Sequence, residues 1–203
     1  AVKEALKLGL YHIDTAAAYF NEAEVGKAVR ESGIPREEIF VTSKLWLQDY
    51  GYEAAKKGID ASLRKLGLDY MDLYLIHQLR RCTGAWKAME EAKKAGKIRS
   101  IGVSNMTPKI WNSFVPQFDT LPSVNQIEFH PYFQQKEIRA IMAKDNVYLE
   151  AGHLLARATR SSSANRPLPR SLKLTVKMPA RSSCALNTKT APSSSRRRPN
   201  RPA

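Results

Sequence analysis

Short apolar runs that alternate with amphipathic helical patterns constrain the fold of this chain more than any other feature. Six such runs occur in the first 150 of the 203 residues, and each is brief and rich in β-branched or aromatic residues. They are Tyr11–Asp14, Ile39–Ser43, Met71–Ile76, Ser100–Val103, Ser123–Ile127 and Val147–Leu149. Parallel strands that are covered on both faces have this character. The alternation therefore predicts repeated βα units around a parallel sheet or barrel.

The segments between these runs carry helix-boundary signals, and a helical pattern also precedes the first run. The expected helices run from an Asn21 cap to about Ser32 with Gly33 as terminator, over 53–66 up to Gly67, over 85–95 up to Gly96, and from Thr107-Pro108 onward. A complete (β/α)8 barrel has eight strands in typically about 250 residues. We therefore expect an incomplete α/β TIM barrel with strands two to seven present and the first and last strands missing.

Charge is distributed very unevenly along the chain. The sequence has 33 Lys and Arg against 19 Asp and Glu, a net charge of +14. Residues 1–150 hold 21 of the basic residues and all 19 acidic residues, whereas 151–203 hold 12 basic residues and neither an acidic nor an aromatic residue. A segment of this composition cannot bury a core. We therefore divide the chain into a partial barrel over 1–151 and a basic Ser/Pro/Arg-rich segment over 152–203 that is expected to be disordered.

Several classes of function are disfavoured by the composition. The sequence contains no run of 18 apolar residues, so no membrane span is predicted. The charged first residues are unlike a signal peptide, and we therefore expect a cytoplasmic protein. The two cysteines, Cys82 and Cys184, lack the spacing of a disulfide framework or metal site, and no metal is predicted. The basic tail could bind nucleic acid, but it lacks aromatic residues that stack on bases, so we do not expect that partner. The oligomeric state stays open.

Polar residues stand where the expected strands end, which is where parallel α/β proteins gather their chemistry. Each one alone has a structural explanation: Asp14 as a turn cap, Lys44 as a solvated strand end, His77 as a core histidine. Different ionisable residues at successive strand ends are harder to explain in that way and favour an active site. The full set is Asp14, Lys44, His77, Ser104, Asn105 and the segment 126–130.

Over residues 1–150 the sequence resembles the aldo-keto reductase family. The matching segments are Gly9–Ala16 with Tyr19 and Asn21-Glu22, then Val41–Trp46, Gly67–His77, Gly96–Arg99, Ile101–Asn105 and Val124–Pro131. Their order and spacing are specific to the family. The resemblance implies an oxidoreductase that transfers a hydride from NADP(H) to a small aldehyde or ketone and forms an alcohol. The family does not use a glycine-rich dinucleotide fingerprint, and none is found in this sequence.

The resemblance also implies a role for each catalytic residue. Tyr19 would be the general acid that protonates the carbonyl oxygen as hydride arrives. The ammonium of Lys44 would make that phenol a better acid, and Asp14 would hold Lys44 in place. His77 would donate to the substrate carbonyl, orient it and share its developing negative charge.

The remaining predicted site residues concern the cofactor and the substrate pocket. By the same resemblance, Ser104, Asn105 and Gln126 would hold the nicotinamide carboxamide, because amide and hydroxyl groups suit an amide partner. Trp46 would wall the substrate pocket, and Gln78 would lie on its rim.

Two stretches depart from the family pattern. Leu79–Thr83 replaces the Pro-x-Gly-Asp that often follows in the family, and Ala151 is not followed by the family's Trp-x-Pro-Leu-Gly. When both stretches are back-translated and read in a shifted frame, permitted codons give family-like sequences, such as Trp-Ala-Pro-Leu-Gly after Ala151. We therefore expect a frame-shifted C-terminal segment in which the part that grips the adenosine phosphates is missing. The alternative to an active reductase is a catalytically inactive remnant of one from a disrupted gene.

Overall fold

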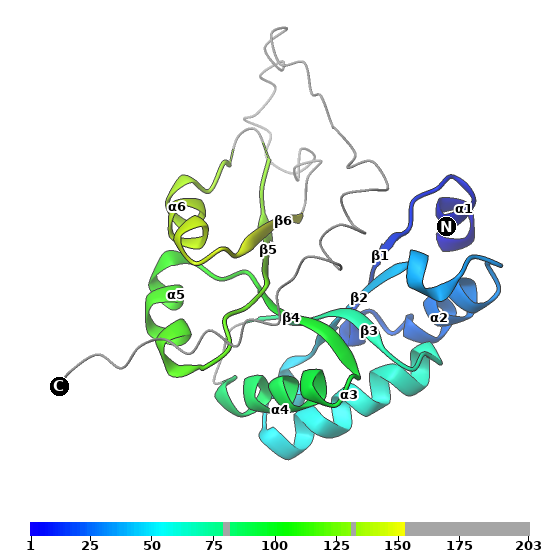
Figure 1. The fold of residues 1–203 in the computed structure, drawn as a ribbon, viewed down its shortest axis with the longest axis horizontal. Coiled ribbons are helices and arrows are strands. Elements are labelled where there is room, and N and C mark those ends of the chain that lie inside the picture. Colours follow the sequence, from blue (N-terminus) through cyan, green and yellow to red (C-terminus); the bar gives the residue numbers. More distant parts are fainter. Residues whose placement is uncertain (79–81, 131–132, 153–203) are drawn as a thin grey trace, which may run out of the picture. The chain divides into compact units, whose positions relative to one another are not determined.

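A computed structural model describes residues 1–78, 82–130 and 133–152 of the chain. The predictions for 79–81, Pro131 and the basic segment from 153 onward lie outside these residues. The described residues contain one six-stranded sheet with the order β1-β2-β3-β4-β5-β6, in which all neighbours are parallel. The strands are β1 (His12–Asp14), β2 (Phe40–Leu45), β3 (Met71–Ile76), β4 (Ile98–Ser104), β5 (Val124–Glu128) and β6 (Tyr148–Gly152). The sheet curves into a half-barrel, as Figure 1 shows, and confirms the predicted parallel α/β architecture.

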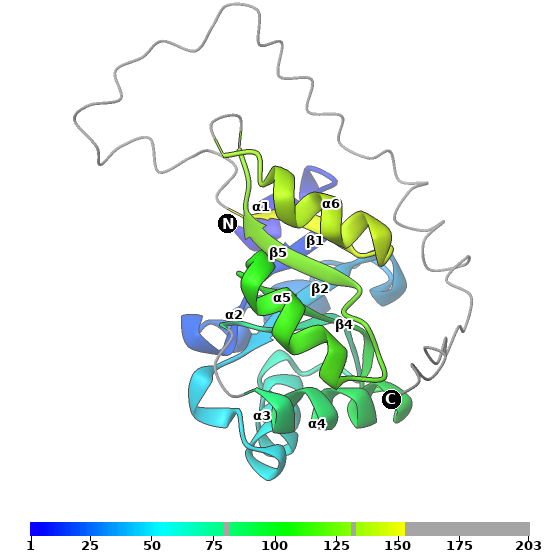
Figure 2. The same ribbon diagram turned by 90° about the vertical axis from the view of Figure 1, so that its left-hand side faces the viewer.

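Helices follow the strands in sequence and cover the outer face of the sheet (Figures 1 and 2). The α-helices are α1 (Val2–Lys7), α2 (Glu22–Arg30), α3 (Tyr52–Leu66), α4 (Thr83–Lys94), α5 (Pro108–Phe114) and α6 (Lys136–Lys144). Four short 3-10 helices lie in the loops, namely η1 (Ala17–Tyr19), η2 (Arg36–Glu38), η3 (Leu47–Asp49) and η4 (Val115–Gln117). Since every connection joins parallel neighbours, all six strands point their carboxyl ends toward the same edge of the sheet.

Several predicted boundaries are confirmed by their local geometry. The predicted strand Met71–Ile76 is β3 without change. α3 ends at Gly67, which has a φ of 62° and so occupies the left-handed region that glycine adopts without strain. Thr107 caps α5 by accepting the N–H of Ile110 at 3.5 Å. α4 starts earlier than predicted, at Thr83, and ends at Lys94.

The predicted cap of α2 is wrong in its mechanism. Asn21 stands at the N-cap position, but its side chain makes no capping hydrogen bond. Its Oδ1 accepts instead from the hydroxyl of Thr15 at 2.6 Å, a partner in the loop after β1 that the helix pattern does not reveal. The helix also ends at Arg30, before the predicted Ser32, and Gly33 lies in the turn beyond it with a φ of 72°.

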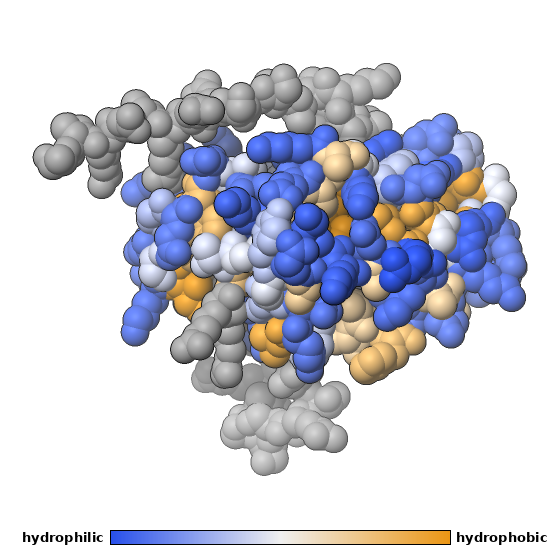
Figure 3. Space-filling view, turned by 90° about the horizontal axis from the view of Figure 1, so that it is seen from below, coloured by the Kyte–Doolittle hydropathy of each residue, from blue (hydrophilic) through white to orange (hydrophobic). Residues whose placement is uncertain are grey.

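The core lies between the sheet and the outer helices. Trp86 of α4 is fully buried and packs edge-on against Phe114 with ring centres 5.9 Å apart. α3 and α4 each bury one apolar face, and hydrophilic residues dominate the surface that Figure 3 shows from their side of the molecule. Within the described part of the chain, no helix is long and apolar enough to cross a membrane, and no group of three or more His, Cys, Asp or Glu residues could hold a metal.

Candidate active site

The register of the first three strands brings four predicted catalytic residues together. Asp14 ends β1, and Lys44 is the penultimate residue of β2. Lys44 is in register with Leu75 of β3. That strand ends at Ile76, and His77 follows it directly. Tyr19 lies in η1, in the loop that leaves β1. These four residues therefore meet at the carboxyl edge of the sheet, although 63 positions separate the first from the last.

Lys44 is the buried centre of this group, with only 1% of its surface exposed. Its ammonium donates to the carboxylate of Asp14 and, at 2.9 Å, to the carbonyl oxygen of Thr15. A buried charge is costly unless it is paired and hydrogen-bonded. Asp14 and the Thr15 carbonyl meet that requirement and fix the position of the ammonium group.

Tyr19 and His77 lie on the solvent side of Lys44. The ammonium nitrogen of Lys44 is 5.2 Å from the centre of the Tyr19 ring. The ring of Tyr19 meets the imidazole of His77 edge to face, with centres 5.7 Å apart. Tyr19 itself is 49% exposed, so part of this residue is open to solvent. The chain turns immediately afterwards at Phe20, whose φ of 55° lies in the left-handed region.

His77 is held in its neutral form. Burial lowers the pKa of the imidazole below its usual 6.5, and the nearby ammonium of Lys44 lowers it further, while Asp14 acts in the opposite direction. The Nδ1 atom is buried and has no hydrogen-bond partner among the described residues. Leaving a donor N–H unpaired in such a position is costly. Both facts favour a neutral imidazole whose proton is on Nε2.

The three predicted cofactor-binding residues lie where β4 ends and in the middle of the neighbouring β5. Ser104 is paired in register with Gln126, and its hydroxyl donates to the backbone carbonyl of Gln126 at 3.0 Å. The side-chain amide of Asn105 donates to the Ser104 hydroxyl at 3.1 Å and to the carbonyl of His77 at 3.4 Å. Asn105 has a φ of 61°, which turns the chain at the strand end. The amide of Asn105 thus contacts His77, while that of Gln126 contacts Asp14.

The two predicted pocket residues border the same place. Trp46 follows β2 directly, and its ring lies edge to face against His77 with centres 5.1 Å apart. Gln78 is exposed and follows His77. Its backbone N–H donates to the hydroxyl of Tyr50 at 2.8 Å.

The structure adds residues to the site that the sequence analysis missed. Glu150 of β6 accepts from the side-chain amide of Gln126 at 3.0 Å, and its carboxylate lies 3.7 Å from Nε2 of His12 in β1. The rule that polar residues at strand ends carry function applies equally to Glu150, since it directly follows the sixth predicted run, Val147–Leu149. The backbone carbonyl of Thr15 accepts a hydrogen bond from Lys44, and the pattern of side chains in a sequence does not reveal such a contact.

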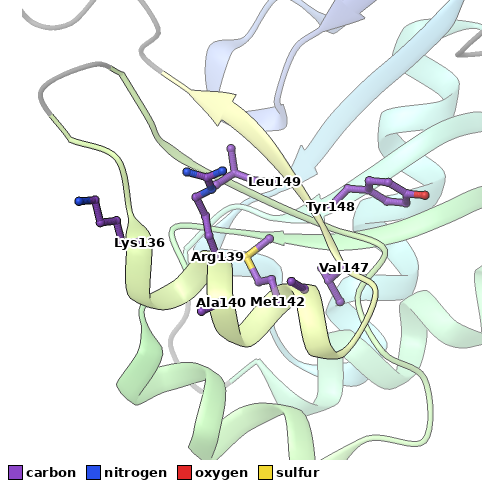
Figure 4. Close-up of a pocket in the computed structure, with 8 residues that line it drawn as sticks. Lys136, Arg139, Ala140, Met142, Val147, Tyr148 and Leu149 are labelled. Carbon is purple, nitrogen blue, oxygen red and sulfur yellow. The ribbon is translucent and has the colours of Figure 1, made fainter.

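A separate hollow lies between α6 and β6 (Figure 4). Two basic residues, Lys136 and Arg139, and six apolar or aromatic residues line it, and none of them belongs to the predicted site. The hollow therefore does not supply the substrate pocket.

Clusters at the carboxyl ends of parallel strands are where enzymes of the (β/α)-barrel class bind and convert their substrates. The position of this cluster, on six parallel strands in chain order, assigns the chain to that class of fold. The chain belongs to the aldo/keto reductase family, whose model matches residues 1–192, and the family is one of oxidoreductases.

Known relatives agree with this assignment. The chain is 46% identical over 153 residues to the glyoxal reductase of Bacillus subtilis, and the aligned region covers 74% of this chain and 55% of that protein. An aldo/keto reductase from Brucella melitensis has a solved structure with a TM-score of 0.74 and 46% identity, covering 76% of this chain and 62% of that one. The Bombyx mori aldo-keto reductase, solved in complex with NADP, has a TM-score of 0.75 and 34% identity, covering 93% of this chain and 64% of that one. This chain thus spans about half the length of the curated relatives it matches.

Proposed function

We propose that this chain carries the catalytic site of an NADP(H)-dependent aldo-keto reductase, which reduces an aldehyde or ketone to the alcohol. The observation that carries the proposal is the grouping of Tyr19 and His77 around the buried ammonium of Lys44, with Asp14 paired to it. Family membership and the NADP complex of the Bombyx mori relative support the choice of reaction and cofactor. The six strands would be the second to seventh of a complete barrel.

In this proposal Tyr19 delivers a proton to the carbonyl oxygen. Tyr19 is half exposed, and the positive charge of Lys44 near its ring would favour the phenolate that remains after proton transfer. Asp14 and the carbonyl of Thr15 hold Lys44 in place throughout. The neutral imidazole of His77 donates from Nε2 to the same carbonyl oxygen and stabilises the negative charge that develops on it.

The cofactor-binding residues fit the amide group of a nicotinamide. When bound, the dihydronicotinamide supplies the hydride. The side-chain N–H groups of Asn105 and Gln126 already donate to neighbouring residues, so in this proposal their carbonyl oxygens accept the N–H groups of the carboxamide. Ser104 is only 4% exposed and donates to the backbone of Gln126, so we assign it to holding Asn105 in place. Trp46 would wall the pocket for a small carbonyl substrate, with Gln78 on the rim, in a cytoplasmic protein.

The test compares the full chain with Tyr19→Phe in an assay of NADPH oxidation with simple aldehydes. We expect Tyr19→Phe to lower kcat by about 10²-fold or more, because a general acid contributes this much, while NADPH binding followed by fluorescence is retained. Tyr148→Phe is the matched control, since Tyr148 is also exposed but lies at the hollow beside α6. A wild-type chain that binds NADPH but does not oxidise it, or binds none, would favour the inactive remnant instead.

A further inference from the structure

Tyr50 lies outside the four-residue catalytic group but is joined to its centre. The residue follows η3 in the loop after β2, and it is only 6% exposed. Its hydroxyl oxygen accepts the backbone N–H of Gln78 at 2.8 Å. Because Gln78 follows His77 directly, this hydrogen bond is made one peptide unit away from the residue that carries the imidazole.

This hydrogen bond gives a partner to a backbone N–H that lies just beyond the end of β3. The N–H of His77 donates to the carbonyl of Leu45 at 3.3 Å, and both β2 and β3 end at this level. The next N–H on this part of the chain belongs to Gln78, and the Tyr50 hydroxyl accepts it. A side chain from the loop after β2 thus satisfies the backbone N–H that follows His77 and ties the segment with His77 to that loop.

The same loop supplies one wall around the imidazole. Trp46 begins the loop that Tyr50 ends, and its ring lies 5.1 Å from His77, on which the ring of Tyr19 also packs. Anchoring Tyr50 to the end of β3 therefore fixes the spacing between Trp46 and His77. Burial raises the pKa of Tyr50 to about 12, although the N–H of Gln78 acts against this effect. The hydroxyl is therefore protonated near neutral pH and offers the same oxygen to that N–H.

We propose that Tyr50 is a positioning residue for His77: its hydroxyl caps the end of β3 and holds the imidazole between Trp46 and Tyr19. The importance of this position for catalysis rests on the proposed reductase function. The hydrogen bond and its effect on His77 are independent of that function and are open to separate measurement.

The decisive variant is Tyr50→Phe, which removes the hydroxyl and keeps the buried ring. Tyr74→Phe is the matched control, because Tyr74 is fully buried in β3 and its hydroxyl shares a hydrogen bond with Ser62 at 3.1 Å. Each variant loses one hydrogen bond of a buried tyrosine hydroxyl, to a backbone N–H in Tyr50→Phe and to a serine hydroxyl in Tyr74→Phe, and the two should lose similar stability in urea unfolding. Only Tyr50→Phe should change the environment of His77.

Two measurements separate positioning from mere stability. In NADPH-dependent reduction, Tyr50→Phe should lower kcat by about fivefold, the effect of one lost hydrogen bond, with KM for NADPH nearly unchanged. In an NMR titration, with the signal assigned by His77→Gln, the pKa of His77 should move up toward 6.5 in Tyr50→Phe, because water reaches the loosened ring. Tyr74→Phe should behave like wild type in both.

Identical kcat values and identical His77 titration curves for the two variants would overturn the proposal. If wild type does not oxidise NADPH, the proposed function fails for this chain, whereas the titration still decides whether Tyr50 positions His77. If Tyr50→Phe does not fold, amide hydrogen exchange of wild type decides the matter. The Gln78 N–H should be protected, and exchange at the rate of an unstructured peptide would contradict the bond on which the inference depends.

Discussion

The side-chain amide of Gln126 donates to the carboxylate of Asp14 at 2.8 Å, although the two residues are 112 positions apart in the chain. The same amide nitrogen donates to Glu150 at 3.0 Å. Gln126 thus joins β5 to the ends of β1 and β6 across the inner face of the half-barrel. One neutral donor separates two carboxylates here, and this arrangement depends on an amide at position 126.

Replacing that amide by a carboxylate should therefore destabilise the fold. Gln126→Glu would place a third negative charge against Asp14 and Glu150, and we expect the free energy of unfolding to fall by about 1–3 kcal/mol near pH 7. Acidification should reduce the difference from wild type, because protonation removes the repulsion. Urea unfolding at several pH values measures it. Gln117→Glu is the control, since Gln117 is an exposed side chain that donates only to the carbonyl of Ser113. Equal losses in both variants would contradict the role given to Gln126.

Removing the charge of Lys44 should lower kcat strongly and affect the stability of the fold much less. Lys44→Met keeps the length of the side chain and leaves Asp14 without its ammonium partner, while Asp14 is still in contact with Gln126. Because the ammonium supports proton transfer from Tyr19, we expect kcat to drop by about 10²–10⁴-fold. Steady-state NADPH oxidation measures the effect. Lys57→Met, at an exposed position of α3, should retain wild-type rates. A Lys44→Met variant with more than a tenth of wild-type activity would remove Lys44 from the mechanism.

Much of this site was predictable because it depends on features local to each strand. The end of β3 and the position of His77 follow from an apolar run and the polar residue after it, and the resemblance to the family assigned the roles. Parallel pairing then brings Asp14, Lys44 and His77 together, since strands of similar length end at one edge.

The rest depended on contacts that form only in the folded chain and that no helix or strand pattern encodes. Asn21 has the residue type of a helix cap, yet its side chain accepts from Thr15 because that hydroxyl is buried next to it. In the sequence, nothing distinguishes Tyr50 from other aromatic residues of loops, and only the folded chain brings its hydroxyl to the N–H of Gln78. Such errors arise where tertiary contacts override local preference.

Acid should destabilise the protein partly through His77. Since the pKa of His77 in the folded state lies below its ordinary 6.5, the unfolded chain binds a proton more readily as the pH falls through that value. The stability contributed by neutral His77 is thus present above pH 6.5 and is lost on acidification. Urea unfolding of wild type should show a larger loss between neutral and mildly acidic pH than His77→Gln. Parallel stability curves for the two proteins over this range would contradict the lowered pKa.

A second buried carboxylate, Asp72, should matter for stability alone. Asp72 is 3% exposed, and it accepts from Arg36 at 2.8 Å, from Arg99 at 3.2 Å and from the N–H of Val41 at 3.0 Å. It lies in β3 near the amino end of the strand, away from the catalytic edge. Asp72→Asn keeps the shape of the side chain but leaves two guanidinium groups without their counter-charge.

We expect Asp72→Asn to lower the free energy of unfolding by about 1–3 kcal/mol, less than for a fully buried ion pair, because the Arg36 and Arg99 side chains are 21% and 43% exposed and can be solvated. Asp60→Asn is the matched control, because Asp60 pairs with Lys97 at 2.6 Å while both side chains are more than 40% exposed. An exposed pair of this kind contributes about 0–1 kcal/mol. At temperatures where both variants are folded, each should keep the wild-type KM for NADPH. A comparable loss of stability in the two variants would show that the Asp72 cluster is as weak as a surface ion pair, despite its burial.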